Sequence, residues 1–138
     1  MVMGLSLFKT IQGTAGRDVL VGTAGDDLII GGAGADTLTG GAGTNVFVYQ
    51  SIRDAGDTIT DFVPGKDFID LRALLISLGV NPATALSSGV VTLVASGSAT
   101  LVQIDTDGSA GPGVARTLVT LSGVSPAAIV ASRDLILQ

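Results

Sequence analysis

The sequence contains no cysteine, histidine or tryptophan, and every one of its 12 acidic residues is an aspartate. Without cysteine the chain forms no disulfide, so an extracellular form needs another stabilising element, for which bound metal is the obvious candidate. The absence of histidine and cysteine also excludes the common zinc sites and the thiol- or imidazole-based catalytic arrangements.

Positive charge is scarce, with 7 lysine and arginine residues in all. The net charge of −5 and the pI near 4.2 argue against nucleic acid or anionic lipid as a partner. Mean hydropathy is +0.62, yet no apolar run reaches the roughly 18 residues of a membrane-spanning helix. The length of 138 residues suits one domain, or one domain with a tail.

Glycine and aspartate are concentrated in the first half of the chain. Ten of the 20 glycines lie within residues 13–48, and nine of the 12 aspartates lie at or before residue 70. Leucine, valine, alanine, serine and threonine dominate the remainder. The composition therefore predicts three parts: a lead-in from a longer parent (1–12), a repeat region with its closing segment (13–70) and a C-terminal region (71–138).

The repeat region has an unbroken period of nine residues. Its four lines are GTAGRDVLV (13–21), GTAGDDLII (22–30), GGAGADTLT (31–39) and GGAGTNVFV (40–48). Glycine stands first and fourth, and alanine third, in every line. The sixth position holds Asp18, Asp27, Asp36 and Asn45, and the eighth holds Leu20, Ile29, Leu38 and Phe47.

Each line predicts a turn followed by a short strand, because glycine and aspartate favour tight turns and the last three residues are mostly apolar. Two lines make one flattened coil, so each repeat stacks on the next but one, roughly 4.8 Å away. This stacking brings Asp18 over Asp36 and Asp27 over Asn45. The eighth-position side chains point inward, and those at the seventh and ninth positions point outward.

Stacked turns of this kind offer a cage of oxygen atoms, which suits Ca²⁺ better than the rigidly octahedral Mg²⁺. We expect two to three calcium ions or more. The alternative, solvated aspartates in a glycine-rich loop, does not account for the period. Besides the sixth-position side chains, the candidate ligands are the residues that open the turns, at the first and third positions: Gly13, Ala15, Gly22, Ala24, Gly31, Ala33, Gly40 and Ala42.

The pattern resembles the calcium-binding nonapeptide G-G-x-G-x-D-x-U-x of repeats-in-toxin (RTX) proteins. The first two lines depart from it with threonine at the second position, and the fourth departs with Asn45 at the sixth. The resemblance implies an all-β fold, a short parallel β-roll. We expect a β-rich C-terminal cap with one short helix to follow it.

The period continues into the degenerate line YQSIRDAGD (49–57). There Asp54 would stack on Asp36 and contribute to a third site, with Asp57 as the alternative ligand. The next segment, DTITDFVPGKDFIDL (57–71), resembles the part that closes the RTX roll in secreted proteases, lipases and adhesins. Whether Asp61 and Asp67 bind metal or form turns stays open, and Asp70 is expected to cap a helix.

The C-terminal region predicts a helix at 71–78 ended by Gly79, strands near 89–95, 99–105 and 116–122, and a last strand at 135–137. The segment DTDGSAGPG (105–113) is a further calcium candidate. Asp105, Asp107 and Ser109 match odd positions of an EF-hand loop, but Ala110 and Arg116 replace its glycine and glutamate. A wide hairpin turn is therefore favoured there.

No catalytic motif is present: G-x-S-x-G, the P-loop and an in-register G-x-G-x-x-G are all missing, so we expect no enzyme. The tail SRDLILQ (132–138) is similar to the uncleaved signals of type I secretion substrates, and residues 13–138 resemble the RTX type I secretion target domain. The resemblance implies a secreted, calcium-binding end module of an adhesin or exoenzyme, exported by a type I transporter. We expect it to be monomeric.

An accessory polysaccharide-binding module of a secreted hydrolase or epimerase is the alternative, and the low aromatic content of four phenylalanines and one tyrosine speaks against it.

The outward positions of the roll also predict which sheet is covered. Strands of the even repeats would present only aliphatic side chains, whereas those of the odd repeats would present a mixture of valine and threonine. Because an exposed aliphatic sheet face is costly, we expect the C-terminal region, including the helix at 71–78, to pack on the even-repeat sheet. The even-repeat residues are Leu28, Ile30, Val46 and Val48, and the odd-repeat residues are Val19, Val21, Thr37 and Thr39.

Overall fold

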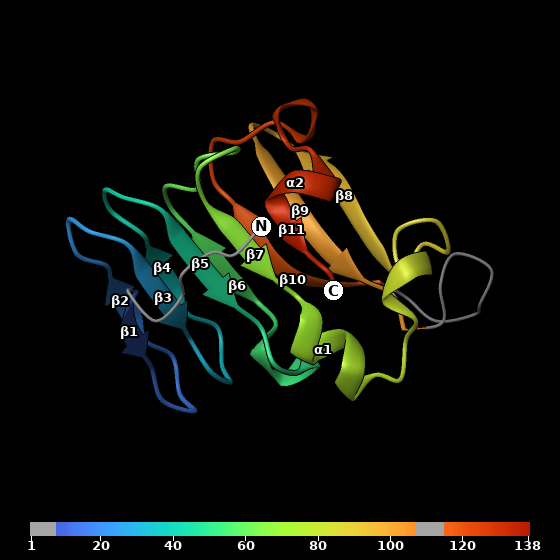
Figure 1. Cartoon of the computed structure of the whole chain (residues 1–138), viewed down its shortest axis with the longest axis horizontal. Helices are drawn as coiled ribbons and strands as arrows, with labels where there is room; N and C mark the ends of the chain where they lie inside the picture. The colour runs from blue at the N-terminus through green and yellow to red at the C-terminus, as the bar shows by residue number, and fades with distance from the viewer. Residues whose placement is uncertain (1–7, 107–114) are drawn as a thin grey trace.

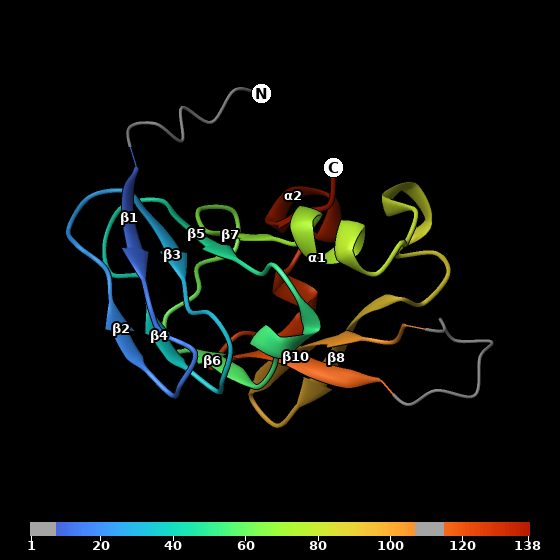
Figure 2. The same ribbon diagram turned by 90° about the horizontal axis from the view of Figure 1, so that it is seen from below.

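Successive strands of the N-terminal half alternate between two facing sheets, as the computed structural model of the chain shows (Figure 1). The structure describes residues 8–106 and 115–138. Seen from the side, the strands lie in two layers (Figure 2). The predicted all-β fold with a parallel roll is confirmed.

The first sheet is parallel at every pairing and has the order β1-β3-β5-β7-β11. Its strands are β1 (Lys9–Gln12), β3 (Asp27–Ile30), β5 (Asn45–Val48), β7 (Phe68–Asp70) and β11 (Leu135–Ile136). The roll therefore begins within the predicted lead-in, because Lys9–Gln12 pairs along the whole of β3.

The second sheet has the order β2-β4-β6-β10-β9-β8 and is parallel from β2 to β10 and antiparallel from there to β8. Its strands are β2 (Val19–Val21), β4 (Thr37–Thr39), β6 (Asp57–Ile59), β8 (Val91–Ser96), β9 (Ala99–Ile104) and β10 (Arg116–Leu121). The C-terminal strands lie within a residue or two of their predicted bounds.

The stacking of each repeat on the next but one is confirmed. Val19 pairs with Thr37 in one sheet, and Asp27 pairs with Asn45 in the other. The eighth-position side chains point into the space between the sheets, where Ile29, Leu38 and Phe47 are at most 1% exposed.

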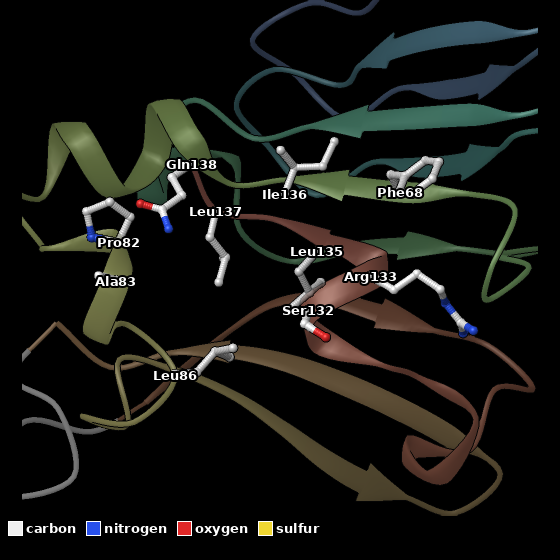
Figure 3. Close-up of a pocket in the computed structure, with 10 residues that line it drawn as sticks. All are labelled: Phe68, Pro82, Ala83, Leu86, Ser132, Arg133, Leu135, Ile136, Leu137 and Gln138. Carbon is white, nitrogen blue, oxygen red and sulfur yellow. The ribbon is translucent and has the colours of Figure 1, made fainter. Parts of the chain in front are cut away.

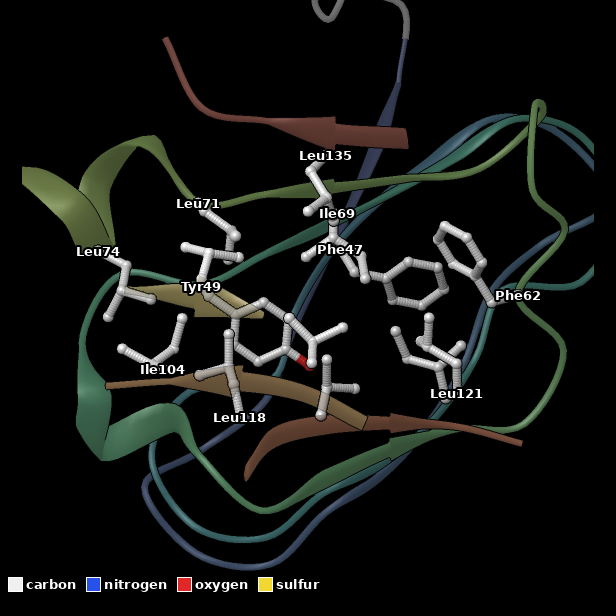
Figure 4. Packing of buried hydrophobic residues seen from close by; sticks show 14 of the residues in the cluster. Phe47, Tyr49, Phe62, Ile69, Leu71, Leu74, Ile104, Leu118, Leu121 and Leu135 are labelled. Atoms are coloured by element: carbon white, nitrogen blue, oxygen red, sulfur yellow. The ribbon is translucent and has the colours of Figure 1, made fainter. Parts of the chain in front are cut away.

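The C-terminal region extends the roll, because β10 pairs in parallel with β6 and β11 pairs in parallel with β7. One hydrophobic cluster therefore runs through both parts, from Ile29 and Phe47 to Leu118 and Leu135 (Figure 4). The helical elements are α1 (Arg72–Ser77), α2 (Ala131–Asp134) and the 3₁₀ helices η2 (Ile52–Asp54), η3 (Pro82–Thr84) and η4 (Pro126–Ala128).

Helix α1 does not cover the even-repeat sheet, which corrects that part of the prediction. It follows β7 directly and lies beyond the end of that strand (Figure 1), with its buried Leu74 and Leu75 in the cluster between the sheets. In Figure 4, Leu71 and Leu74 lie at the same end of this cluster as Ile104. The reason is geometric, since a helix that leaves the end of a sheet can fill the open end of the sandwich.

The predicted contrast between the two outer faces is limited to the edge strand β2, because Thr37 and Thr39 on β4 are half-buried, as most of the even-repeat residues are. On the odd-repeat strand β2, Val19 is 74% exposed and Val21 is 63% exposed. On the even-repeat strand β5, Val46 is fully buried, and its neighbours on the same face of that sheet are half-buried.

Candidate metal centre

The first two turns close on their own aspartates. The backbone N–H of Thr14 donates to Asp18 Oδ2 at 2.7 Å, and its hydroxyl hydrogen-bonds the same carboxylate. Thr23 binds Asp27 in the same way, with its N–H at 2.7 Å from Oδ2. In each of the first two repeats, the threonine at the second position therefore hydrogen-bonds the carboxylate of the same repeat.

Carboxylates of later coils bind the backbone of earlier ones. The N–H of Asp18 donates to Asp36 Oδ1 at 2.8 Å, and the N–H of Asp36 donates to Asp57 Oδ1 at 2.8 Å. We call Asp18, Asp36 and Asp57 the odd column. In the even column, Asp27, Asn45 and Asp67, the N–H of Asn45 donates to Asp67 Oδ1 at 3.0 Å.

The structure corrects the register after residue 48. Asp57, and not Asp54, stacks on Asp36, since Thr37 pairs with Thr58. The third odd turn is longer than a nonapeptide because it contains the 3₁₀ helix η2. Asp54 ends that helix and accepts hydrogen bonds from the backbone N–H groups of Gln50 and Ser51 at 2.8 and 3.2 Å.

Two carboxylate oxygens of the odd column are buried and have no hydrogen-bond partner among residues 8–106 and 115–138. They are Asp36 Oδ2 and Asp57 Oδ2, on residues that are 2% and 1% exposed. A Cβ atom at Gly31 would lie 2.6 Å from the first and 3.4 Å from the second. Both oxygens therefore converge on a space that exists only because residue 31 is glycine.

Burial makes the charged form of these acids costly. It raises the pKa of Asp57 to about 7, and the charges of Asp36 and Asp54 act in the same direction. Burial also raises the pKa of Asp36, with a further increase from the charge of Asp18. A divalent cation between the two would offset both the desolvation and the repulsion.

The donor set fits a hard cation that takes oxygen ligands. Within residues 8–106 and 115–138, no three acidic side chains gather at one point, so backbone carbonyls must complete a coordination shell of about six to eight oxygens. Such carbonyls lie close to the turns: a Cβ at Gly13 would meet the oxygen of Gly31 at 2.5 Å, and one at Gly34 would meet that of Ala15 at 3.2 Å.

The even column offers a second, less charged site. The side-chain oxygen of Asn45 is buried and has no hydrogen-bond partner in the described part of the chain. A Cβ at Gly22 would collide with the carbonyl oxygen of Gly40, so main-chain oxygen is close here too. Ala24, Ala33 and Ala42 occupy matching turn positions, where only their carbonyls can act as ligands.

The remaining aspartates of the closing segment bind backbone or arginine. Asp61 accepts hydrogen bonds from the N–H groups of Gly40 and Gly41, both at 2.8 Å. Asp70 ends β7 and does not cap α1 as predicted, because the N-cap is Leu71 and it has no side-chain cap. Asp70 instead accepts from the N–H of Arg72 at 3.0 Å and pairs with the guanidinium of that residue at 2.7 Å. Of the second calcium candidate, Asp107 and Ser109 lie outside the described residues.

Three residues of this network escape the nonapeptide pattern. Asp67 joins the even column, and its other oxygen accepts from the N–H of Val63 at 2.9 Å. Tyr49 occupies the first position of the fifth line, where the other lines have glycine. Asp134 lies in the C-terminal tail. The repeat pattern therefore does not predict a role for Tyr49 or Asp134.

Asp134 fastens the tail to the closing segment. It is fully buried, accepts from the N–H of Gly65 at 2.8 Å and from that of Val130 at 2.9 Å, and pairs with Arg133 at 2.8 Å. Burial alone would raise the pKa of Asp134, but these hydrogen bonds together lower it. The carboxylate is therefore held in its charged form.

A groove of about 410 Å³ lies beside β7 and β11 (Figure 3). Phe68, Leu86 and Leu137 contribute to its lining, and Arg133 is the charged residue there. No aspartate is among its lining residues, so this groove is not the metal centre. No helix within the described residues has the length and apolar character that a membrane crossing requires.

Comparisons with known proteins agree with the repeat geometry. A family model, the RTX calcium-binding nonapeptide repeat in four copies, matches residues 12–47. The chain therefore carries RTX calcium-binding repeats, and calcium is the metal that they imply. None of the curated proteins matches the sequence.

Two similar solved structures are subunits of a mannuronan C5-epimerase from Azotobacter vinelandii. The AlgE6R3 subunit is 27% identical with a TM-score of 0.59, and the match covers 95% of this chain and 83% of that one. The AlgE6R2 subunit is 24% identical with a TM-score of 0.62, and the match covers 96% and 93% of the two chains. The second likeness concerns the fold alone.

Proposed function

We propose that this chain is a calcium-stabilised, non-catalytic module of a larger secreted protein. The observation that carries the proposal is the pair Asp36 and Asp57, whose buried, unpaired oxygens converge on Gly31. In this proposal the two carboxylates and the carbonyls of the stacked turns hold one calcium ion, and the Asn45 turn holds another. Calcium supplies positive charge that makes the buried carboxylates compatible with the folded state.

The free energy involved is large for a domain of this size. At a calcium concentration a hundredfold above the dissociation constant, each ion that binds only the folded form stabilises it by about 2.7 kcal/mol. The total stability of a domain is about 5–15 kcal/mol. Two or three ions therefore decide whether the chain folds.

This dependence suits export in the unfolded state. Where calcium is scarce, buried carboxylates disfavour the fold and the chain stays extended. Outside the cell, calcium is abundant and folding follows. We propose that a type I transporter reads the C-terminal segment 132–138 before folding, because Asp134 and Leu135 are buried once the tail has docked.

Far-UV circular dichroism of the full chain tests the proposal. The spectrum in excess chelator should be mainly disordered, and calcium should restore β signal at concentrations where magnesium does not. A chain that is fully folded in chelator and gains no stability from calcium would contradict the proposed role.

A second candidate function is an accessory module that binds a polysaccharide beside a catalytic domain. The similarity to subunits of a mannuronan epimerase favours it. Against it, all five aromatic side chains are buried or half-buried, so none is exposed for stacking on a sugar ring. Calorimetric titration of the calcium-saturated chain with mannuronan oligosaccharides separates the two candidates, since only the accessory module should release heat.

A further inference from the structure

The hydroxyl of Tyr49 is buried and has no hydrogen-bond partner among the residues that the structure describes. The residue is 1% exposed, and it follows β5, where its backbone N–H donates to the carbonyl of Asp70 at 3.0 Å. In Figure 4 its ring lies among core side chains that include Leu118. An unpaired buried hydroxyl costs about 1–3 kcal/mol, so its environment needs an explanation.

That environment contains Asp57. The Tyr49 side chain lies next to the Asp57 carboxylate, close enough for the two side chains to interact directly. Asp57 uses Oδ1 to accept from the N–H of Asp36 and leaves Oδ2 unpaired. The Tyr49 hydroxyl, an unpaired donor, thus lies beside Asp57 Oδ2, an unpaired acceptor, among the described residues.

The repeat register explains how tyrosine reaches this place. The odd turns open with Gly13, Gly31 and Tyr49. In the first two, the space where a Cβ would stand is closed by the carboxylate of the same turn, at 2.7 Å for Asp18 and 2.6 Å for Asp36. The third odd turn is enlarged by η2, and a large side chain enters the core there instead.

We propose that Tyr49 is a positioning residue, whose hydroxyl donates a hydrogen bond to Asp57 Oδ2 and orients that carboxylate for the calcium ion shared with Asp36. The inference rests on the proposed calcium-binding function. A hydrogen bond to a charged acceptor is stronger than one between neutral groups, and a carboxylate oxygen can accept it while also binding a cation. This hydrogen bond would pair both of the unpaired buried groups.

A double-mutant cycle on the full chain tests the inference. Calcium titration calorimetry is run on the native chain, Tyr49→Phe, Asp57→Asn and the double variant. Tyr49→Phe keeps the ring and should weaken one calcium site about tenfold, equivalent to about 1.4 kcal/mol. In the Asp57→Asn background the same substitution should have no further effect on that site. An equal loss in both backgrounds means that Tyr49 acts through packing alone, which overturns the proposal.

Thr100→Val is the matched control. Thr100 is also a fully buried hydroxyl, but it donates to the carbonyl of Val124 at 2.6 Å, away from the repeat turns. Thr100→Val measures how a general decrease in stability affects calcium affinity. Tyr49→Phe must weaken the site shared by Asp36 and Asp57 by more than this control does. A native chain that binds no calcium refutes the proposed function, whereas binding that Tyr49→Phe leaves unchanged refutes this inference alone.

A spectroscopic measurement serves if Asp57→Asn fails to fold. The chain has one tyrosine and no tryptophan, so its ultraviolet emission comes from Tyr49. A phenol that donates to a carboxylate is quenched. The calcium-saturated native chain should therefore emit less per tyrosine than the same chain denatured in urea, and strong, unquenched emission from the folded chain overturns the hydrogen bond.

Discussion

The backbone N–H of Asp36 donates to the carboxylate of Asp57, 21 residues further along the chain, at 2.8 Å. The matching bond one coil earlier, from Asp18 to Asp36, spans 18 residues. The odd column therefore keeps its contacts while the chain between them lengthens by the turn that contains η2. What the fold preserves is the position of the carboxylate in space, and not the period of the sequence.

The elevated pKa of Asp57 predicts that acid favours the metal-free fold. Asp57 titrates near pH 7 when folded and has an ordinary value of 3.8, so between these limits the folded form binds more protons than the unfolded form. Stability in chelator should fall as pH rises through that window. The pKa values of Asp36 and Asp67 are raised as well and act in the same direction, whereas that of Asp134 is lowered and matters only at more acidic pH.

Circular dichroism in chelator at pH 5 and pH 8 checks this expectation. The folded fraction should be larger at pH 5, and Asp57→Asn should reduce the difference. Calcium should reverse the trend, because the ion binds the ionised carboxylates. A larger folded fraction at pH 8 without calcium would contradict the assignment.

A second prediction concerns Gly31. In Gly31→Ala the new Cβ would lie 2.6 Å from Asp36 Oδ2, so the carboxylate must move or the turn must open. We expect a loss of about 1–3 kcal/mol in unfolding free energy at saturating calcium, together with weaker calcium binding. Urea denaturation measures the first and calorimetry the second.

Gly16→Ala is its control. A Cβ at Gly16 would have a single near neighbour, the Thr14 hydroxyl oxygen at 3.7 Å, which is ordinary contact. This substitution should change stability and calcium affinity little. Equal effects of the two alanines would show that the space at Gly31 has no special role.

A third prediction concerns Asn45, the neutral member of the even column. Its unpaired oxygen lies in a turn whose backbone N–H already binds Asp67. Asn45→Asp adds a carboxylate to this site, and calcium affinity rises with the number of charged ligands. Calorimetry should show one site tightening while the others stay unchanged. No tightening at any site would count against the even column as a calcium site.

A fourth prediction concerns Asp134. Asp134→Asn replaces a buried carboxylate that accepts from two backbone N–H groups and pairs with Arg133. Since hydrogen bonds to a charged group contribute about 1.5–3 kcal/mol, we expect a loss of that order in unfolding free energy at saturating calcium. Arg72→Gln, which breaks the more exposed pair with Asp70, should cost less than about 1 kcal/mol. Chemical denaturation of both variants checks the ranking, and the reverse order would contradict it.

The nonapeptide period was sufficient to predict the roll, the stacking of repeats and the inward eighth position, because those follow from a strict spacing. It was insufficient for Asp54 and Asp57, since the length of an inserted turn is set by how residues 52–54 pack, and spacing carries no such information. The period does not predict the role of Tyr49 for a related reason. An aromatic residue at a glycine position is read from the sequence as a degenerate repeat, and only the structure shows that its side chain is buried in the core.

The position of α1 differs from the prediction, which rests on four aliphatic side chains on one sheet face that a helix could cover. Leu71, Leu74 and Leu75 instead close the end of the sandwich, where the last coil leaves the core open. A sequence gives the amphipathic character of a helix more readily than the surface against which it packs.

The pairing of β10 with β6 and of β11 with β7 has a consequence for the order of folding. Both sheets of the roll are completed by strands from the last quarter of the chain, so contacts of very high sequence separation close the core. Such closure is slow compared with local contacts, and it cannot occur before residues 116–136 are available. During synthesis, which proceeds from the N-terminus, the calcium turns therefore emerge before the strands that complete the core beneath them. Folding is thus timed by the arrival of the last strands.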